Sequence, residues 1–157
     1  MRRLIALLAV LLPALPLAAQ TPARIVSTSP SITETLYALG LGPRVVGVTT
    51  FCNFPPEARS KPKVGTFLEP DYERILQLRP SLVLVIKNPV GVTGRLRSLG
   101  LKAEELDMAN IQSIFVSTAR IGPLTGPEPS ARRLAESLRR DLDSIRSKPV
   151  GTGPFKL

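Results

Sequence analysis

Three short apolar runs between residues 24 and 86 constrain the fold of this chain more than any other feature. They are Arg24–Thr28, Arg44–Thr49 and Leu82–Ile86, and each is rich in β-branched residues and almost unbroken in hydrophobicity. A sheet with one solvated face would instead alternate apolar and polar residues, so these runs indicate parallel strands covered on both faces. The sequence therefore predicts an α/β fold with a short, mostly parallel sheet flanked by helices.

Ligand sites in sheets of this kind lie beyond the carboxyl ends of the strands. The segments that follow the three predicted strands are Ser29-Pro30-Ser31, residues 50–55 and Lys87-Asn88-Pro89. These segments carry the small, polar and aromatic residues that a binding site needs. We therefore place the candidate functional site there.

Helix signals separate the predicted strands. The first helix ends at Gly40 and begins at Ser29 or Ser31, since either hydroxyl can cap it. A second helix begins near Asp71 and stops before Pro80. The remaining predicted elements are a short strand near residues 63–65, a helix over 94–99, a strand over 101–106 and a helix over 110–121. The glycines and prolines of residues 122–127 predict a boundary at the end of a lobe that spans residues 23–125.

A long amphipathic helix is predicted over residues 128–148, because Leu134, Leu138, Leu142 and Ile145 recur at helical spacing. Many of the basic residues behind the net charge of +9 lie in this segment, mostly on the opposite face of the helix. No nucleic-acid recognition motif or aromatic platform accompanies them. We interpret the charge as a solvated helix face and expect no nucleic-acid partner.

The first 19 residues have the organisation of a signal peptide. Arg2 and Arg3 form a charged start, residues 4–12 are almost wholly apolar, and Ala18-Ala19 suits a cleavage site. The apolar run is shorter than the roughly 20 residues of a membrane-spanning helix. We expect a periplasmic protein that is not inserted in the membrane after cleavage.

Residue usage leaves little room for catalysis. The chain has no histidine, which removes the common triads and histidine-based metal sites, and Cys52 is its single cysteine. We expect neither catalytic residues, nor a resident cofactor, nor a metal site. A secreted enzyme with a nucleotide-binding-like domain stays an alternative, although the first strand does not lead into a Gly-x-Gly-x-x-Gly turn.

Several segments together resemble one family, the substrate-binding components of ABC importers for cobalamin, haem and siderophores. The resemblance runs from about residue 24 to residue 148 and is carried by residues 24–40, 46–56, 64–67, 73–75 and 78–84. It implies two α/β lobes joined by one long rigid helix, here residues 128–148. The second lobe is absent from the sequence, and the tail at residues 149–157 does not resemble its beginning.

The resemblance also implies ligand contacts. Phe51 and Phe67 occupy positions of aromatic residues that contact the corrin ring in cobalamin receptors, and flat rings suit a large planar ligand. Ile86 stands where those receptors place a further aromatic residue. Cobalamin is therefore the main expected ligand, with an iron siderophore or haem as the alternative.

Four other residues complete the predicted ligand site. Ser29, Ser31 and Asn53 can donate hydrogen bonds to ligand amides or carboxylates. Cys52 can be a soft metal ligand or, more commonly for a lone cysteine, a small buried residue.

Three aromatic residues and one glutamate receive other predictions. Phe54, Tyr37 and Tyr72 are expected to pack in the core. The resemblance places Glu73 on the face that docks the importer's permease through arginine pairs.

Overall fold

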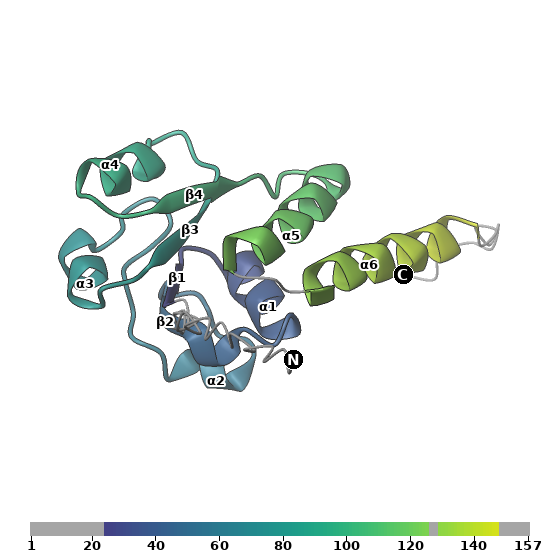
Figure 1. Cartoon of the computed structure of the whole chain (residues 1–157), viewed down its shortest axis with the longest axis horizontal. Coiled ribbons are helices and arrows are strands. Elements are labelled where there is room, and N and C mark those ends of the chain that lie inside the picture. The colour runs from purple at the N-terminus through teal and green to yellow at the C-terminus, as the bar shows by residue number, and fades with distance from the viewer. Residues whose placement is uncertain (1–23, 126–128, 148–157) are drawn as a thin grey trace, which may run out of the picture.

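The computed structural model in Figure 1 describes residues 24–125 and 129–147. They form an α/β lobe, from which a long C-terminal helix extends. The predicted α/β fold is confirmed. The predicted signal peptide and the tail at residues 149–157 lie outside the described residues.

Four parallel strands make the sheet. They are β1 (Ile25–Ser27), β2 (Val45–Val48), β3 (Leu82–Ile86) and β4 (Ala103–Leu106), in the spatial order β2-β1-β3-β4. Every neighbouring pair is parallel, so the carboxyl ends of all four strands lie along one edge. The sequence analysis predicted all four strands to within two residues at either end.

The helices are α1 (Pro30–Ala38), the 3₁₀ helix η1 (Gly42–Arg44), α2 (Pro56–Arg59), α3 (Tyr72–Gln77), α4 (Val92–Ser98), α5 (Ile111–Thr125) and α6 (Pro129–Arg146). α2 is a single turn that the sequence analysis did not predict. The strand predicted near residues 63–65 is wrong, because this segment makes only isolated bridges, Val48 with Lys63 and Gly65 with Pro70.

Both faces of the sheet are covered, as the unbroken apolar runs predicted. α1 and α5 pack on one face over a cluster that includes Ile25, Leu36, Leu84, Leu106 and Ile121. α3 and α4 pack on the other face over Val26, Ile75, Val83, Val85 and Leu96. Consecutive strand residues point to opposite faces, so β1 and β3 supply both clusters.

Ser29 begins α1. Its hydroxyl accepts a hydrogen bond from the Ile32 amide at 3.3 Å, and Pro30 occupies the first helical position, where its missing amide hydrogen costs nothing. The choice between Ser29 and Ser31 as the cap is therefore settled in favour of Ser29. The cap places the start of α1 directly at the carboxyl end of β1.

The helix predicted over residues 110–121 is longer in the structure, since α5 continues through Pro123 to Thr125. Two side chains support this last turn. Thr125 donates from its own hydroxyl to the Ile121 carbonyl at 2.9 Å, and Arg44 donates to the Thr125 carbonyl at 2.9 Å. A carbonyl that no helix amide can reach is thus satisfied by a cation.

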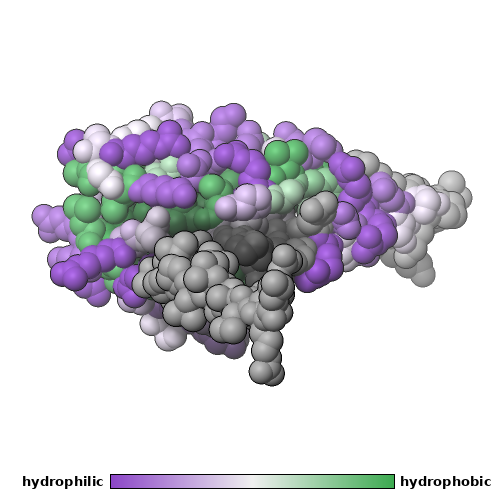
Figure 2. Space-filling view, viewed as in Figure 1, coloured by the Kyte–Doolittle hydropathy of each residue, from purple (hydrophilic) through white to green (hydrophobic). Residues whose placement is uncertain are grey.

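α6 packs against α5 at its beginning. Leu134 is partly buried against the core cluster of α1 and α5, and the Arg139 guanidinium lies 5.5 Å from the centre of the Phe115 ring. The space-filling view shows mainly hydrophilic side chains on the described part of α6 (Figure 2). Ile145, near its end, is largely exposed.

Arg79 gives a first testable prediction, because it follows α3 with a φ of 45°, in the left-handed region. A side chain there costs about 1 kcal/mol relative to glycine. The Arg24 guanidinium donates to the carbonyls of Leu78 at 2.7 Å and Arg79 at 3.3 Å, and these bonds do not need the Arg79 side chain. Arg79→Gly should raise the free energy of unfolding by about 1 kcal/mol in urea.

The matched control for Arg79→Gly is Arg95→Gly, in the interior of α4. Glycine in a helix interior lowers stability by about 1 kcal/mol. Opposite signs for the two variants are expected. A loss of stability in both would contradict strain at Arg79.

Candidate functional site

Residues from three strands meet at the carboxyl edge of the sheet. β1 leads to Ser29 and Ser31 at the start of α1, β2 leads to residues 49–55, and β3 ends at Ile86. Because β1 is the central neighbour of β2 and β3, these three segments are adjacent. The fold thus brings together the ligand-site residues that the sequence analysis took from them.

Phe51 and Phe67 are exposed aromatic side chains on two segments that hydrogen bonds join. Phe51 is 59% exposed and Phe67 is 39% exposed. Both the amide and the hydroxyl of Thr50 donate to the Gly65 carbonyl, at 3.0 and 2.9 Å. Thr50, which precedes Phe51, is therefore bonded to Gly65, which lies two positions before Phe67. The two rings lie 16 positions apart in sequence.

The segment that carries Phe67 is a closed turn. The Thr66 amide donates to the Glu69 carbonyl at 3.0 Å, and the Glu69 amide donates to the Thr66 hydroxyl at 2.9 Å. Gly65 begins this turn with a φ of +80°, a conformation that favours glycine. Leu68, beside Phe67, is also partly exposed, so the turn presents two apolar side chains to solvent.

The predicted polar contacts differ in their accessibility. Ser31 and Asn53 are exposed, whereas Ser29 is buried, with its hydroxyl 3.1 Å from that of Ser31. Ile86 is partly buried at the end of β3. Ser31 and Asn53 can therefore meet a ligand directly, and Ser29 acts first as the helix cap.

Cys52 is fully buried beneath the edge. Its sulfur lies 3.2 Å from the Thr33 hydroxyl, which donates to it, and 3.0 Å from the Thr49 hydroxyl. Within the described residues, no group of three or more histidine, cysteine, aspartate or glutamate side chains could hold a metal ion. In this structure the thiol has protein partners and no solvent access.

Phe54 corrects a prediction. We expected it in the core, but it is 64% exposed and lines a pocket of about 610 Å³ between α1 and α2. Among residues 51–54, Cys52 is the one that is buried. Its neighbours Phe51, Asn53 and Phe54 are exposed.

Tyr37 and Tyr72 are partly buried against the two core clusters, as predicted. Burial raises the pKa of Tyr37, and the nearby charge of Glu57 raises it further. Among the described residues its hydroxyl has no hydrogen-bond partner. The Tyr37 ring packs against the core cluster and also lines the pocket beside Phe54.

Glu73 is exposed in the first turn of α3, next to Tyr72. Asp71 caps this helix by accepting the Arg74 amide at 2.8 Å. The Glu73 carboxylate is therefore not needed as the cap of α3. Its side chain is open to a partner.

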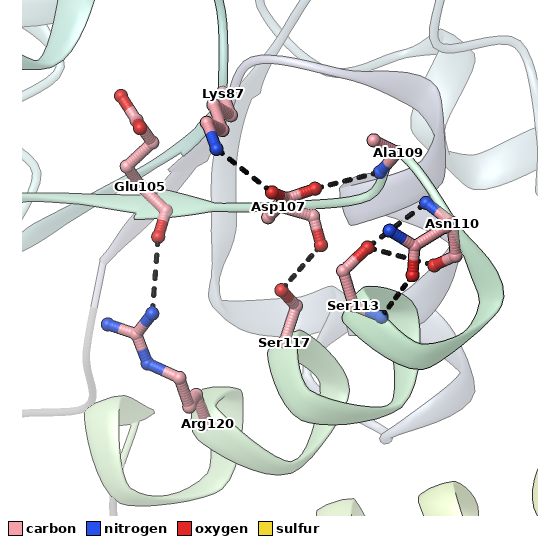
Figure 3. A network of polar contacts seen from close by, with 8 residues as sticks. All are labelled: Lys87, Glu105, Asp107, Ala109, Asn110, Ser113, Ser117 and Arg120. Atoms are coloured by element: carbon pink, nitrogen blue, oxygen red, sulfur yellow. Dashed lines mark hydrogen bonds and ion pairs between the residues drawn. The ribbon is translucent and has the colours of Figure 1, made fainter.

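A polar network at the carboxyl ends of β3 and β4 joins Lys87, which lies in a candidate segment of the sequence analysis, to residues after β4 that the sequence analysis did not name (Figure 3). Lys87 pairs with Asp107 at 3.1 Å, and the Ser117 hydroxyl donates to the Asp107 carbonyl at 2.7 Å. The Ala109 amide and then Lys87 hold the pKa of Asp107 below its usual value. Because Asp107 directly follows β4, the rule applied to the first three strands would have found it.

These features define a class before any comparison: a parallel α/β lobe that presents exposed aromatic residues at the carboxyl edge of its sheet. The sequence profile of the family described as "Periplasmic binding protein" matches residues 25–148, and the chain belongs to this family. No helix within residues 24–125 and 129–147 is long and apolar enough to span a membrane.

Named relatives agree with the family. The chain is 35% identical over 132 residues to an uncharacterised ABC transporter substrate-binding lipoprotein of Bacillus subtilis, covering 81% of this chain and 42% of that protein. It is 30% identical over 142 residues to the vitamin B12-binding protein of Yersinia pestis, covering 89% and 51%. The chain thus spans about half the length of these relatives.

Solved structures give the same result. The periplasmic vitamin B12-binding protein of Vibrio cholerae superposes with a TM-score of 0.73 at 27% identity, over 80% of this chain and 51% of that one. A periplasmic haem-binding protein of Pseudomonas aeruginosa also gives 0.73, at 26% identity, over 80% and 46%. The names of these two relatives describe them as binding proteins.

Proposed function

We propose that this chain is the N-terminal ligand-binding lobe of a periplasmic substrate-binding protein that delivers a metal chelate, chiefly cobalamin, to an ABC importer. The observation that carries the proposal is the pair of exposed rings, Phe51 and Phe67, joined through Thr50 and Gly65. Exposed rings are unfavourable in water unless something covers them, and a large planar chelate offers a matching apolar face.

Haem or an iron siderophore is the alternative ligand. Two observations favour it: Ile86 replaces an aromatic residue expected for cobalamin, and the haem-binding protein of Pseudomonas aeruginosa is as similar in fold as the B12-binding protein. The Yersinia pestis relative and the resemblance of Phe51 and Phe67 support cobalamin as the first candidate.

The direct test is calorimetric titration of the chain with cyanocobalamin, haemin and a ferric siderophore. Cyanocobalamin should bind, but at least about tenfold more weakly than it binds the vitamin B12-binding protein of Vibrio cholerae, because one lobe covers one face of a ligand. If haemin binds and cyanocobalamin does not, haem replaces cobalamin as the proposed ligand. Binding of none of the three would reject it.

Glu73 is proposed to dock the permease. The experiment uses a rebuilt receptor, in which this chain is joined to the second half of the Yersinia pestis vitamin B12-binding protein. Glu73→Ala should reduce cobalamin uptake through that organism's importer several-fold, because a lost docking charge weakens association with the permease. Affinity for cyanocobalamin should not change, because Glu73 lies in the first turn of α3, outside the two segments that carry Phe51 and Phe67.

Glu69→Ala is the matched control, because Glu69 is also exposed and lies four residues earlier, in the turn that carries Phe67. Its removal should leave uptake near the level of the unchanged receptor. Equal loss of uptake in the two variants, or loss of cyanocobalamin affinity in Glu73→Ala, would contradict a specific docking role.

A further inference from the structure

The loop at residues 49–55 combines an exposed ring with a backbone that is anchored on both sides. We propose that Lys63 and Arg59 are positioning residues that fix the Phe51 ring before ligand binds. The loop would then be a rigid platform rather than a lid. This inference rests on the proposed function, because it concerns how the proposed ligand contact is held.

Two cations hold the backbone that follows Phe51. Lys63 donates from its ammonium group to the Cys52 carbonyl at 3.3 Å and to the Ala58 carbonyl at 3.3 Å. Arg59 donates from Nε to the Asn53 carbonyl at 2.9 Å. Bonds donated by charged groups are stronger than neutral ones, so two successive carbonyls are fixed in direction.

Lys63 is itself held by the sheet, since it forms a parallel bridge with Val48 at the end of β2. The Val64 amide donates to the Val48 carbonyl at 3.0 Å, and the Val48 amide donates to the Pro62 carbonyl at 3.0 Å. The Lys63 side chain therefore extends from a fixed backbone. Its four-carbon stem reaches from this backbone to the Cys52 and Ala58 carbonyls.

The backbone before Phe51 is fixed by different contacts. Thr50 is bonded through its amide and its hydroxyl to the Gly65 carbonyl, and the Cys52 amide donates to the Thr49 carbonyl at 3.2 Å. The buried sulfur of Cys52 is enclosed by the hydroxyls of Thr33 and Thr49. Phe51 therefore projects to solvent from a loop whose neighbouring residues face inward or are bonded.

An anchored loop contributes to affinity by lowering the entropy lost on binding. A ring on a mobile loop must be ordered when ligand arrives, whereas a ring on a fixed loop loses only side-chain freedom. Deleting an anchor should therefore weaken binding even though Lys63 and Arg59 are not proposed to touch the ligand. This dependence separates positioning from direct contact.

The experiment compares Lys63→Met, Lys63→Arg and Arg59→Met in the chain, with Lys61→Met as the control. Among the described residues, the Lys61 side chain donates no hydrogen bond to the loop at residues 49–55. Hydrogen exchange of the amides at residues 51–53 is measured without ligand, and cyanocobalamin affinity is measured by calorimetry.

We expect Lys63→Met and Arg59→Met to speed exchange at residues 51–53 and to weaken cyanocobalamin binding by about threefold to tenfold. Lys63→Arg should restore both, which lost stability alone would not explain, and Lys61→Met should change neither. Arg59 is exposed, so Arg59→Met keeps the test valid if Lys63→Met does not fold.

Two outcomes would overturn the positioning role and leave the proposed function standing. One is unchanged exchange in both methionine variants, and the other is faster exchange with unchanged affinity. If Phe51→Ala keeps full affinity, or if the unchanged chain binds no cyanocobalamin, the proposed contact itself fails and the inference fails with it.

Discussion

Gly65→Ala is expected to lower the free energy of unfolding by about 3 kcal/mol or more. Gly65 has a φ of +80°, and an added Cβ would collide with the Glu69 carbonyl oxygen and lie 2.8 Å from the Asp71 amide nitrogen. Both contacts are with backbone atoms, which cannot rotate away as a side-chain end can. The turn that carries Phe67 must therefore open, and urea unfolding measures the cost.

Gly100→Ala is the matched control, because Gly100 has a φ of +79° and nothing lies within 4 Å of its added Cβ. It has the same conformational strain without the collision, so it should cost only about 1 kcal/mol. The difference between the two variants isolates the close approach of the backbone. Equal losses would show that strain alone explains Gly65.

Gly65→Ala should also affect the site. The Gly65 carbonyl accepts both bonds from Thr50, so its displacement disturbs the segments of Phe51 and Phe67 together. Stability and ligand affinity should fall in the same variant. Gly100, which follows the C-cap of α4, should affect stability alone.

The sheet could be predicted from the sequence because its signal is local. Leu82–Ile86 is an unbroken apolar run, and its burial on both faces in β3 follows directly from that composition. Ser29 and Gly40 marked the ends of α1 in the same way, since capping depends on neighbouring residues. The lobe was thus predictable from contacts within short segments.

The errors came where a side chain or a turn depends on distant parts of the chain. The segment near residue 64 reads as a strand, but Gly65 turns the backbone and leaves only isolated bridges. α2 has four residues, too few for a periodic apolar pattern. Phe54 was predicted to lie in the core, but it is exposed, and its neighbour Cys52 is buried instead.

The anchors of the candidate site could not be predicted at all. Lys63 and Arg59 act through long side chains on backbone carbonyls, and no sequence pattern specifies such contacts. Phe67 was found only through a family resemblance, whereas Phe51 also lies in a segment that follows a predicted strand. Their exposure on joined segments is a property of the fold.

Phe51→Ala and Phe67→Ala should each weaken cyanocobalamin binding about tenfold, and the double variant should weaken it about a hundredfold if the rings act independently. Each ring can bury an apolar face against a planar chelate, worth on the order of 1 to 3 kcal/mol. Because Phe51 is 59% exposed and Phe67 39% exposed, removal of either ring should change the free energy of unfolding less than removal of a fully buried phenylalanine, and Phe51→Ala should change it least. Calorimetric titration and urea unfolding of the same samples check both expectations.

Phe54→Ala and Cys52→Ser are the controls for these ring variants. Phe54 lies in the same loop and is as exposed as Phe51, but it lines the pocket between α1 and α2, so its removal should leave affinity near that of the unchanged chain. Cys52→Ser keeps a small group that can bond Thr33 and Thr49, so affinity should again change little. If Cys52→Ser instead lost affinity and shifted the absorbance of the bound metal while both ring variants bound normally, the thiolate would be the ligand contact. The carboxyl edge would then open on binding to expose a residue that is buried without ligand.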